Sequence, residues 1–198
     1  MAGGALVRSG LVGLFVGGSA RRMKGFPKGF LRGSSGLSIV EQHWRMVAQL
    51  GWEAVLVGVH PAYAHFAREH QLQCLEDEPF GIGPLGGFAS LLRCAGRRLC
   101  IALACDMPHV AFEDLEALAL CPSQAPALLP RRRYWEPLFG RYDACRVRPA
   151  LEAFLEAGGR SFQGFLETLS PEVFFPKAPK TLEDWDSFED IDFAKDSR

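Results

Sequence analysis

The sequence predicts a single α/β domain: a Rossmann-like, three-layer α/β/α arrangement with a mostly parallel sheet. Short apolar runs that suit strands buried on both faces alternate along the chain with amphipathic segments that suit helices. The chain has 198 residues, which fits one domain better than two, and 48% of them are hydrophobic, which is ample for one core. Together these observations favour one domain over residues 1–198.

The first predicted element is a buried strand that runs into a glycine-rich, cationic loop. Residues 11–16 are apolar or glycine, and the run stops at Gly17 and Gly18. Glycines lack Cβ, so the backbone after the strand can turn sharply and bring successive N–H groups within reach of an anion. Four cationic side chains follow: Arg21, Arg22, Lys24 and Lys28. The loop is therefore predicted to bind phosphate.

The spacing in this loop excludes two common nucleotide motifs. It contains no G-x-x-x-x-G-K-[ST] of the P-loop type and no G-x-G-x-x-G of the dinucleotide-binding type. Two other interpretations remain: a glycine turn followed by solvated basic residues, and the apolar part of a signal peptide over residues 10–18. The signal peptide is disfavoured because the run ends in Gly-Gly followed by arginines rather than in an A-x-A-like cleavage site.

The next four elements follow from caps, periodicity and apolar runs. Ser38 has the capping-box spacing that starts a helix, and Gly51 ends that helix. His43 lies on its apolar face and is interpreted as a core histidine. A buried strand, a short helix and a short strand are then predicted over residues 54–59, 62–69 and 72–75. Because strands of a doubly wound sheet present ligand-binding residues at their carboxyl ends, Gly58 and His60 are expected beside the glycine loop.

An acidic loop, a helix and the most apolar strand come next. The acids at residues 76–78 precede a loop rich in glycine and proline. Pro84 suits the first turn of a helix that extends to about Ala95, because its missing N–H costs little there. Residues 99–104 are predicted to form the central strand. Asp106 follows within the sequence Asp-Met-Pro. A carboxylate is unfavourable in a core but suits a metal ligand, so Asp106 is predicted to bind a metal. The alternative is an Asx turn at the strand end.

The remaining elements complete the alternation. A helix over residues 112–119 begins with acids, Asp114 among them, that suit the positive end of a helix. A strand, a turn of three arginines, a further strand, two helices and a late strand are predicted over residues 125–129, 131–133, 135–142, 148–157, 161–169 and 172–175. The sequence from about residue 183 is acidic, and a solvated tail is one interpretation of it.

Three motifs resemble those of the molybdenum cofactor guanylyltransferases and the wider molybdopterin-type nucleotidyltransferase family. They are Gly17-Gly18-x-x-Arg21-Arg22-Met23-x-Gly25-x-x-Lys28-Gly29, then Gly-Pro-Leu-x-Gly over residues 83–87 after an acid, and Asp-Met-Pro over residues 106–108. Residues 184–190 also align with the family's Asn-x-Asn-Thr-Pro-Glu-Asp segment. The chain departs from the family pattern at Phe15, Val16, Lys24, Pro27, Gly58 and Asp186. The family commonly has asparagine near Gly58.

This resemblance implies the nucleotidyltransferase type of the fold and assigns roles to residues. Catalytic roles are implied for Arg22, Lys28 and Asp106. Nucleotide binding is implied for Phe15, Val16, Gly17, Gly18, Lys28, Gly58, Asp77, Pro84, Leu85, Gly86 and Asp106. The loop near residue 85 is expected to recognise guanine, and a magnesium ion is expected on Asp106 and Asp186. On the acceptor side, Arg133, Trp135 and Arg141 are candidates to meet a pterin and its phosphate.

The implied activity is Mg²⁺-dependent transfer of GMP from GTP to molybdopterin, with release of pyrophosphate. One alternative is a related enzyme that uses CTP or another phosphorylated acceptor. A second alternative, from a different class, is a nucleotide-binding partner protein with little catalysis, against which the intact Lys28 and Asp106 argue. The resemblance also implies contacts with molybdoenzymes or with other proteins of the cofactor pathway.

Composition bears on the partners and the location. The formal net charge is −1, which gives no global attraction to nucleic acid or to anionic membranes. No stretch reaches the roughly 18 consecutive apolar residues of a membrane span. The six cysteines show no C-x-x-C or metal-finger spacing and are interpreted as free thiols in a reducing compartment. We therefore expect a cytoplasmic protein with neither nucleic acid nor membrane as a partner.

Overall fold

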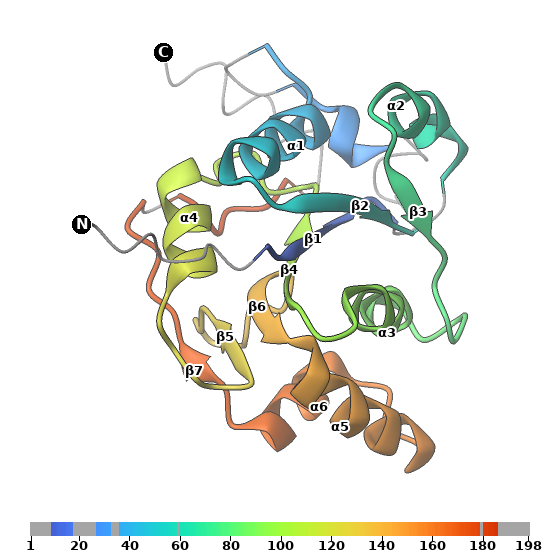
Figure 1. Ribbon diagram of the computed structural model, residues 1–198, viewed down its shortest axis with the longest axis vertical. Coiled ribbons are helices and arrows are strands. Elements are labelled where there is room, and N and C mark those ends of the chain that lie inside the picture. Colours follow the sequence, from blue (N-terminus) through green and yellow to red (C-terminus); the bar gives the residue numbers. More distant parts are fainter. Residues whose placement is uncertain (1–8, 18–26, 33–35, 59, 179, 186–198) are drawn as a thin grey trace, which may run out of the picture.

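The computed structural model describes residues 9–17, 27–32, 36–58, 60–178 and 180–185. Over these residues the chain forms a seven-stranded sheet in the order β3-β2-β1-β4-β6-β5-β7 (Figure 1). Strands β1 to β4 run parallel to one another, β6 is antiparallel to β4 and β5, and β7 is parallel to β5. The predicted α/β domain with a mostly parallel sheet is confirmed.

The elements have the following bounds. The strands are β1 Leu11–Phe15, β2 Glu53–Val57, β3 Gln73–Leu75, β4 Leu99–Ala104, β5 Ala127–Leu129, β6 Phe139–Asp143 and β7 Glu172–Val173. The α-helices are α1 Ile39–Leu50, α2 Ala64–Glu69, α3 Pro84–Ala95, α4 Phe112–Leu120, α5 Ala144–Glu156 and α6 Phe162–Leu169. Two short 3₁₀ helices, η2 Lys28–Phe30 and η3 Pro61–Tyr63, follow β1 and β2.

Helices cover both faces of the sheet, which gives the three predicted layers (Figure 1). Side chains alternate along β1, as the period of a strand requires. Val12 and Leu14 join the core that packs on α1, α2 and α4, and Leu11 and Phe15 join the core that packs on α3, α5 and α6. All five residues of β1 are buried, because helices cover the strand from both sides.

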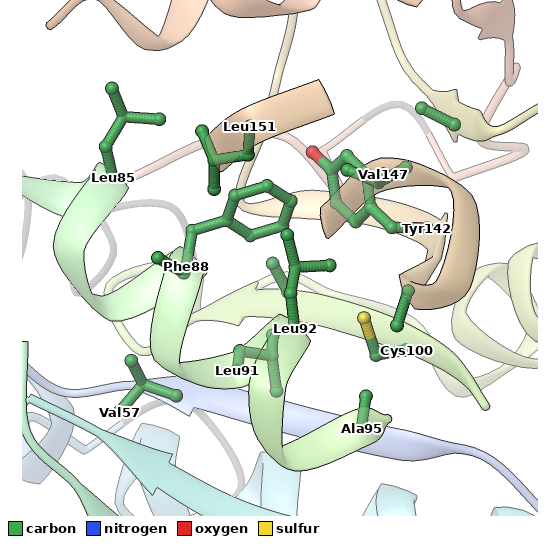
Figure 2. Packing of buried hydrophobic residues seen from close by; sticks show 14 of the residues in the cluster. Val57, Leu85, Phe88, Leu91, Leu92, Ala95, Cys100, Tyr142, Val147 and Leu151 are labelled. Atoms are coloured by element: carbon green, nitrogen blue, oxygen red, sulfur yellow. The ribbon is translucent and has the colours of Figure 1, made fainter. Parts of the chain in front are cut away.

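Phe88 fixes α3 against the carboxyl-terminal helices. Its side chain is fully buried, and its ring centroid lies 4.6 Å from that of Tyr142 and 4.9 Å from that of Phe162. Figure 2 shows the ring pointing from α3 toward Leu151 on α5. Aromatic pairs at these separations add to the stabilisation from burial alone. The start of α3, which belongs to the predicted base-recognition loop, is therefore mounted on a well-packed helix.

The pairing of β1 with its two neighbours determines where the loops emerge. Phe15, the last residue of β1, is paired with Val57 on one side and with Ala104 on the other. The amide of Cys105 donates to the carbonyl oxygen of Phe15 at 3.1 Å. The loops after β1 and β4 therefore leave the sheet side by side, at the point where the strand order reverses and where such sheets bind ligands.

Several predicted boundaries agree with the structure. Residues 99–104 form the central strand, Pro84 occupies the first turn of α3, and Ser38 caps α1 by accepting from the amide of Glu41. The start of α5 differs: it begins at Ala144 rather than near residue 148. The side chain of Asp143 accepts from the amides of Cys145 and Arg146, which caps the helix directly at the end of β6.

The structure also bears on the predictions about membrane-spanning segments and cysteines. Within the described parts of the chain, no helix combines the length and the apolar character needed to cross a membrane. All six cysteines are free, as predicted, and Cys100 and Cys105 are buried in the two cores.

Candidate functional site

A cleft opens at the carboxyl ends of β1, β2 and β4. Its lining comes from the loops after these strands: Phe15, Val16, Gly17, Pro27, Lys28, Gly29, His60, Tyr63, Cys105 and Asp106. Five of these residues are among those for which the resemblance implied nucleotide binding: Phe15, Val16, Gly17, Lys28 and Asp106. His60 is also present, as its place after β2 predicted.

Lys28 and Asp106 face each other across this cleft. The Nζ atom of Lys28 lies 3.3 Å from Oδ2 of Asp106, although 78 residues separate them in sequence. The side chains are 22% and 29% exposed, so both are accessible to a ligand. A cation and a carboxylate at this separation can hold a negatively charged phosphate and a metal ion next to each other.

Tyr63 holds the turn that carries Lys28. The amide of Gly29 donates to the Tyr63 hydroxyl at 2.9 Å, and a Cβ at Gly29 would lie 2.7 Å from that oxygen. The Tyr63 ring also stacks on Phe30, with centroids 4.6 Å apart. Burial raises the pKa of Tyr63 above its usual value, so its hydroxyl stays neutral. Sequence reasoning missed Tyr63; its one available signal was its place just after a predicted strand end.

The three carbonyl groups of the Asp-Met-Pro turn are all hydrogen-bonded. Asp106 O accepts from the Trp185 amide at 2.8 Å, Met107 O from Nε2 of His43 at 3.0 Å, and Pro108 O from Nε2 of Gln42 at 3.4 Å. Paired backbone groups of this kind fix the orientation of a turn. The backbone that carries the Asp106 carboxylate is thus held from α1 and from the carboxyl-terminal segment.

His43 is a core histidine, as predicted. It is fully buried, and burial lowers its pKa to about 4. Its Nε2 must carry the proton, because the carbonyl of Met107 can only accept. Nδ1 is then unprotonated, and this atom is buried without a hydrogen-bond partner.

Gly17, which lines the cleft, lies directly against Gly58. Gly58 has φ +91°, and a Cβ on it would lie 2.6 Å from Cα of Gly17. The amides of Val16 and Gly17 both donate to Val57 O, at 3.0 and 3.2 Å. The Gly17 amide therefore already has a backbone partner on β2, and nucleotide binding by Gly17 stays a prediction. The close approach leaves no room for a side chain at Gly58.

The predicted base-recognition loop packs against the start of α3. A Cβ on Gly87 would lie 2.9 Å from Oδ1 of Asp77, and a Cβ on Gly86 would lie 2.4 Å from Pro79 O. These glycines therefore let the loop lie against the helix. Burial raises the pKa of the Asp77 carboxyl. Leu85 is 1% exposed and belongs to the core, so its side chain is not available to a base.

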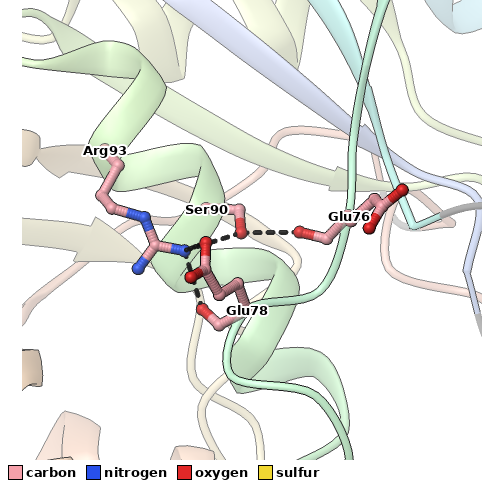
Figure 3. Close-up of polar contacts among 4 residues, drawn as sticks. All are labelled: Glu76, Glu78, Ser90 and Arg93. Carbon is pink, nitrogen blue, oxygen red and sulfur yellow. Dashed lines mark hydrogen bonds and ion pairs between the residues drawn. The ribbon is translucent and has the colours of Figure 1, made fainter.

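Two polar side chains of α3 fasten this loop, and sequence reasoning missed both. Ser90 donates to Glu76 O at 2.6 Å, and Arg93 donates to Glu78 O at 2.9 Å (Figure 3). Arg93 also contacts the Glu78 carboxylate and the Ser90 hydroxyl, each at 3.0 Å. Their spacing of three residues on one helix face was the signal that could have pointed to a shared partner.

Two of the three residues expected on the acceptor side are buried and hydrogen-bonded within the fold. Arg141 is 3% exposed and donates to three backbone carbonyls, those of Ala119, Cys121 and Ser123. Trp135 is 4% exposed, and its Nε1 donates to Glu167 at 3.0 Å. The expectation that these two side chains meet a pterin is wrong, because both are committed to the fold. Arg133 is exposed and lies over the ring of Tyr134.

Three expected site residues, Gly18, Arg22 and Asp186, lie outside the described residues, as do Arg21 and Lys24. In the parts of the chain that are described, no group of three or more His, Cys, Asp or Glu residues is placed to hold a metal ion. Asp106 is the described carboxylate at the cleft, and a site of this kind would complete its coordination with phosphate oxygens and water, as magnesium sites at nucleotides do.

Comparisons with known proteins agree with this geometry. Residues 13–171 match the model of the MobA-like NTP transferase domain family. A molybdenum cofactor guanylyltransferase from Ectopseudomonas mendocina (strain ymp) is 35% identical over 164 residues, 80% of this chain and 77% of that protein. A probable molybdenum cofactor guanylyltransferase from Trichormus variabilis (strain ATCC 29413 / PCC 7937) is 38% identical over 114 residues, 55% of each chain. The crystal structure of molybdopterin-guanine dinucleotide biosynthesis protein A from Archaeoglobus fulgidus has a TM-score of 0.74 and 25% identity, and the match covers 94% of this chain and 97% of that one.

The contact between Gly58 and Gly17 predicts that Gly58→Ala lowers the free energy of unfolding. A left-handed φ costs a non-glycine residue roughly 1–2 kcal/mol, and the overlap with Gly17 adds to that. Gly51→Ala is the matched control, because Gly51 has φ +75° and no atom lies within 4 Å of the place that its Cβ would take. In urea unfolding, Gly58→Ala should lose more stability than Gly51→Ala. Equal losses would mean that the close approach does not exist.

The buried state of His43 predicts a pH dependence of stability. With a folded pKa of about 4 against a usual value of 6.5, the unfolded chain binds the proton more readily, so stability falls as pH drops through this window. The total change is about 3 kcal/mol, from 1.36 kcal/mol per pKa unit. His43→Gln keeps a donor for Met107 and cannot titrate. In urea unfolding, the free energy of unfolding of wild type should exceed that of the variant by less at pH 4.5 than at pH 7. The same difference at both pH values would contradict a neutral buried His43.

Proposed function

Since this chain belongs to the MobA-like NTP transferase domain family, we propose that it transfers GMP from GTP to molybdopterin and releases pyrophosphate. It is a nucleotidyltransferase by family. The single observation that carries the proposal is the approach of Lys28 to Asp106, 3.3 Å apart at the strand ends where nucleotides bind in sheets of this type. The finer assignments, namely the acceptor, the metal and the individual site residues, are part of the proposal.

Lys28 is proposed to bind the triphosphate. Nucleotidyl transfer displaces pyrophosphate, so negative charge grows on the leaving oxygens, and a cation already positioned there stabilises it. The contact of Lys28 with Asp106 keeps the ammonium in the cleft. Arg22, the other proposed cation, would act on the same phosphates. Tyr63 contributes by holding the amide of Gly29, next to Lys28.

Asp106 is proposed to hold a divalent cation, Mg²⁺, with Asp186 as a second proposed ligand. The site fits a hard cation, since its described protein donor is a carboxylate and Mg²⁺ commonly takes one or two carboxylates with substrate phosphates and water. When bound, such an ion neutralises charge on the phosphates of donor and acceptor. The chain's own part is to keep the carboxylate oriented through the three hydrogen-bonded carbonyls of its turn.

The reaction needs no general base from the protein. A phosphate acceptor is already ionised at neutral pH, so the site must hold it in line with the α-phosphorus rather than remove a proton. Two titratable groups of the cleft agree with this role, because burial raises the pKa of the Cys105 thiol and of Tyr63, which keeps both neutral. Neither group is poised to take a proton near pH 7.

Asp77 and the turn at Pro84 to Gly86 are proposed to read the base. A half-buried carboxylate can accept from the ring and exocyclic N–H groups of guanine, and cytosine offers a different pattern of donors. An enzyme that uses CTP would keep Lys28 and Asp106 and differ at this loop. Contacts with molybdoenzymes or pathway proteins and a cytoplasmic location, both expected from the sequence, remain proposals.

The direct test is incubation of the protein with molybdopterin, Mg²⁺ and either GTP or CTP, followed by mass analysis of the pterin product. The proposal expects the mass of the guanine dinucleotide, in equal amount with pyrophosphate, and little cytosine product. A cytosine product would establish the alternative nucleotide. Nucleotide binding without any product would establish the non-catalytic alternative.

We expect Asp106→Asn to lose turnover and to keep its fold. Asn has the same shape but lacks the charge that holds a cation, and loss of such an electrostatic contact typically costs about 10²- to 10³-fold in kcat. Glu116→Gln, at an exposed position of α4, removes the same charge away from the cleft and should leave pyrophosphate release unchanged. Normal release by Asp106→Asn would remove Asp106 from the mechanism.

A further inference from the structure

We propose that Trp185 and Asp114 are positioning residues for the nucleotidyl transfer. They act through one segment, here called the C-terminal strap, which comprises residues 177–178 and 180–185. Asp114 anchors the strap at one end, and Trp185 at the other end holds the turns that carry Lys28 and Asp106. The assignment deepens the proposed function and rests on it.

Asp114 is the anchor. This aspartate of α4 is 1% exposed, where an ionised carboxylate is stable only if it is fully hydrogen-bonded. Its Oδ1 accepts from the Lys177 amide at 2.7 Å, and its Oδ2 accepts from the Ala178 amide at 3.1 Å and from the Thr181 hydroxyl at 2.5 Å. In the sequence Asp114 lies among the acids that start α4, and its partners lie more than 60 residues further along the chain.

The strap runs in compact turns from this anchor to the cleft. The amide of Thr181 donates to Ala178 O at 3.2 Å, and that of Glu183 donates to Lys180 O at 2.9 Å. Thr181 is fully buried, and Leu182 packs against the core that contacts α1 and α4. Glu183 and Asp184 are exposed, as the interpretation of a solvated tail expects, but that interpretation is wrong at Trp185, which is 6% exposed.

Trp185 contacts both sides of the cleft. Its amide donates to Asp106 O at 2.8 Å, and its indole packs in a cluster with Leu31 and Ile39. Leu31 ends the turn of Lys28, because its amide donates to Lys28 O at 2.9 Å. One residue thus joins the backbone of the Asp106 turn to the end of the Lys28 turn. The ring of His109 meets the indole edge to face, 5.9 Å away.

This arrangement matters for catalysis because the two charged groups sit on separate loops. Strand pairing fixes where each loop starts, through Phe15 and Cys105, but not how far each turn leans over the cleft. Transfer between phosphates tolerates little misplacement, and an error of about 1 Å can cost about 100-fold in rate. The hydrogen bond of Tyr63 holds one turn, that of Lys28. The hydrogen bonds of His43 and Gln42 hold the other turn, whereas the strap reaches both. Its anchor is a buried charge that cannot easily leave its hydrogen bonds.

The test compares Trp185→Ala with Trp185→Phe and with Lys180→Ala, an exposed position of the same strap. The first readout is hydrogen exchange of the nucleotide-free protein in peptides covering residues 28–32 and 105–109, because exchange reports local opening. The proposal expects faster exchange in both peptides for Trp185→Ala, and wild-type exchange for Trp185→Phe and Lys180→Ala. Unchanged exchange in Trp185→Ala would overturn the proposal.

The second readout is the division of the effect between kcat and KM for GTP, measured well below the melting temperature of each variant. Trp185→Ala should lower kcat by about 10- to 100-fold, as a misplaced reacting group would, with a smaller change in KM. Faster exchange with an unchanged kcat would make Trp185 merely structural and would also overturn the proposal. If wild type itself fails to transfer GMP, the proposed function fails, whereas the exchange result still decides whether the strap holds the turns.

Thr181→Val tests the anchor without removing the buried charge. Valine matches threonine in shape but cannot donate to Asp114, so one of the three hydrogen bonds is lost while the two backbone donors stay. In Thr181→Val the same two peptides should exchange faster than in Lys180→Ala. The increase should be smaller than the increase in Trp185→Ala. Exchange equal to that of Lys180→Ala would show that the anchor does not act on the cleft.

Discussion

The parallel pairing of β1 with β4 is the constraint on which the rest of the site depends. It places Phe15 beside Ala104, so the loops that follow both strands emerge together at one edge of the sheet. The helices on both faces bury every residue of these two strands except Leu99, which is partly buried. This burial fixes the register, because a slip of one residue would move every side chain to the other face. Lys28 and Asp106 meet because of this register, far apart as they are in sequence.

Around that edge, most of the remaining contacts hold backbone in place. Tyr63 holds the turn of Lys28. The turn of Asp106 is held by His43, Gln42 and Trp185. The loop at Asp77 is held by Ser90 and Arg93. Catalysis of phosphate transfer by positioned charges requires groups that do not reorganise during the reaction. A site of loops gains that rigidity when its carbonyls and amides are satisfied by residues from packed helices.

Much of the fold could be predicted from the sequence, because the signals are local. Gly83, Pro84 and Gly96 mark the ends of α3, and the central strand is a continuous apolar run, so both were predicted at their observed bounds. Asp106 was found for the same reason, as a carboxylate directly after a buried strand. The partners of Gly17, Asp114 and Arg141 could not be predicted, since each lies on another element and local rules do not specify which distant carbonyl or amide meets them.

The most direct measurement of the central claim is a crystal structure of the wild-type protein with GTP and Mn²⁺, read at the manganese anomalous signal. The account predicts a manganese peak in direct contact with the Asp106 carboxylate, with the triphosphate beside it and Lys28 turned from Asp106 to a phosphate oxygen. A triphosphate bound elsewhere, with Lys28 still paired to Asp106 and no manganese at the strand ends, would contradict it.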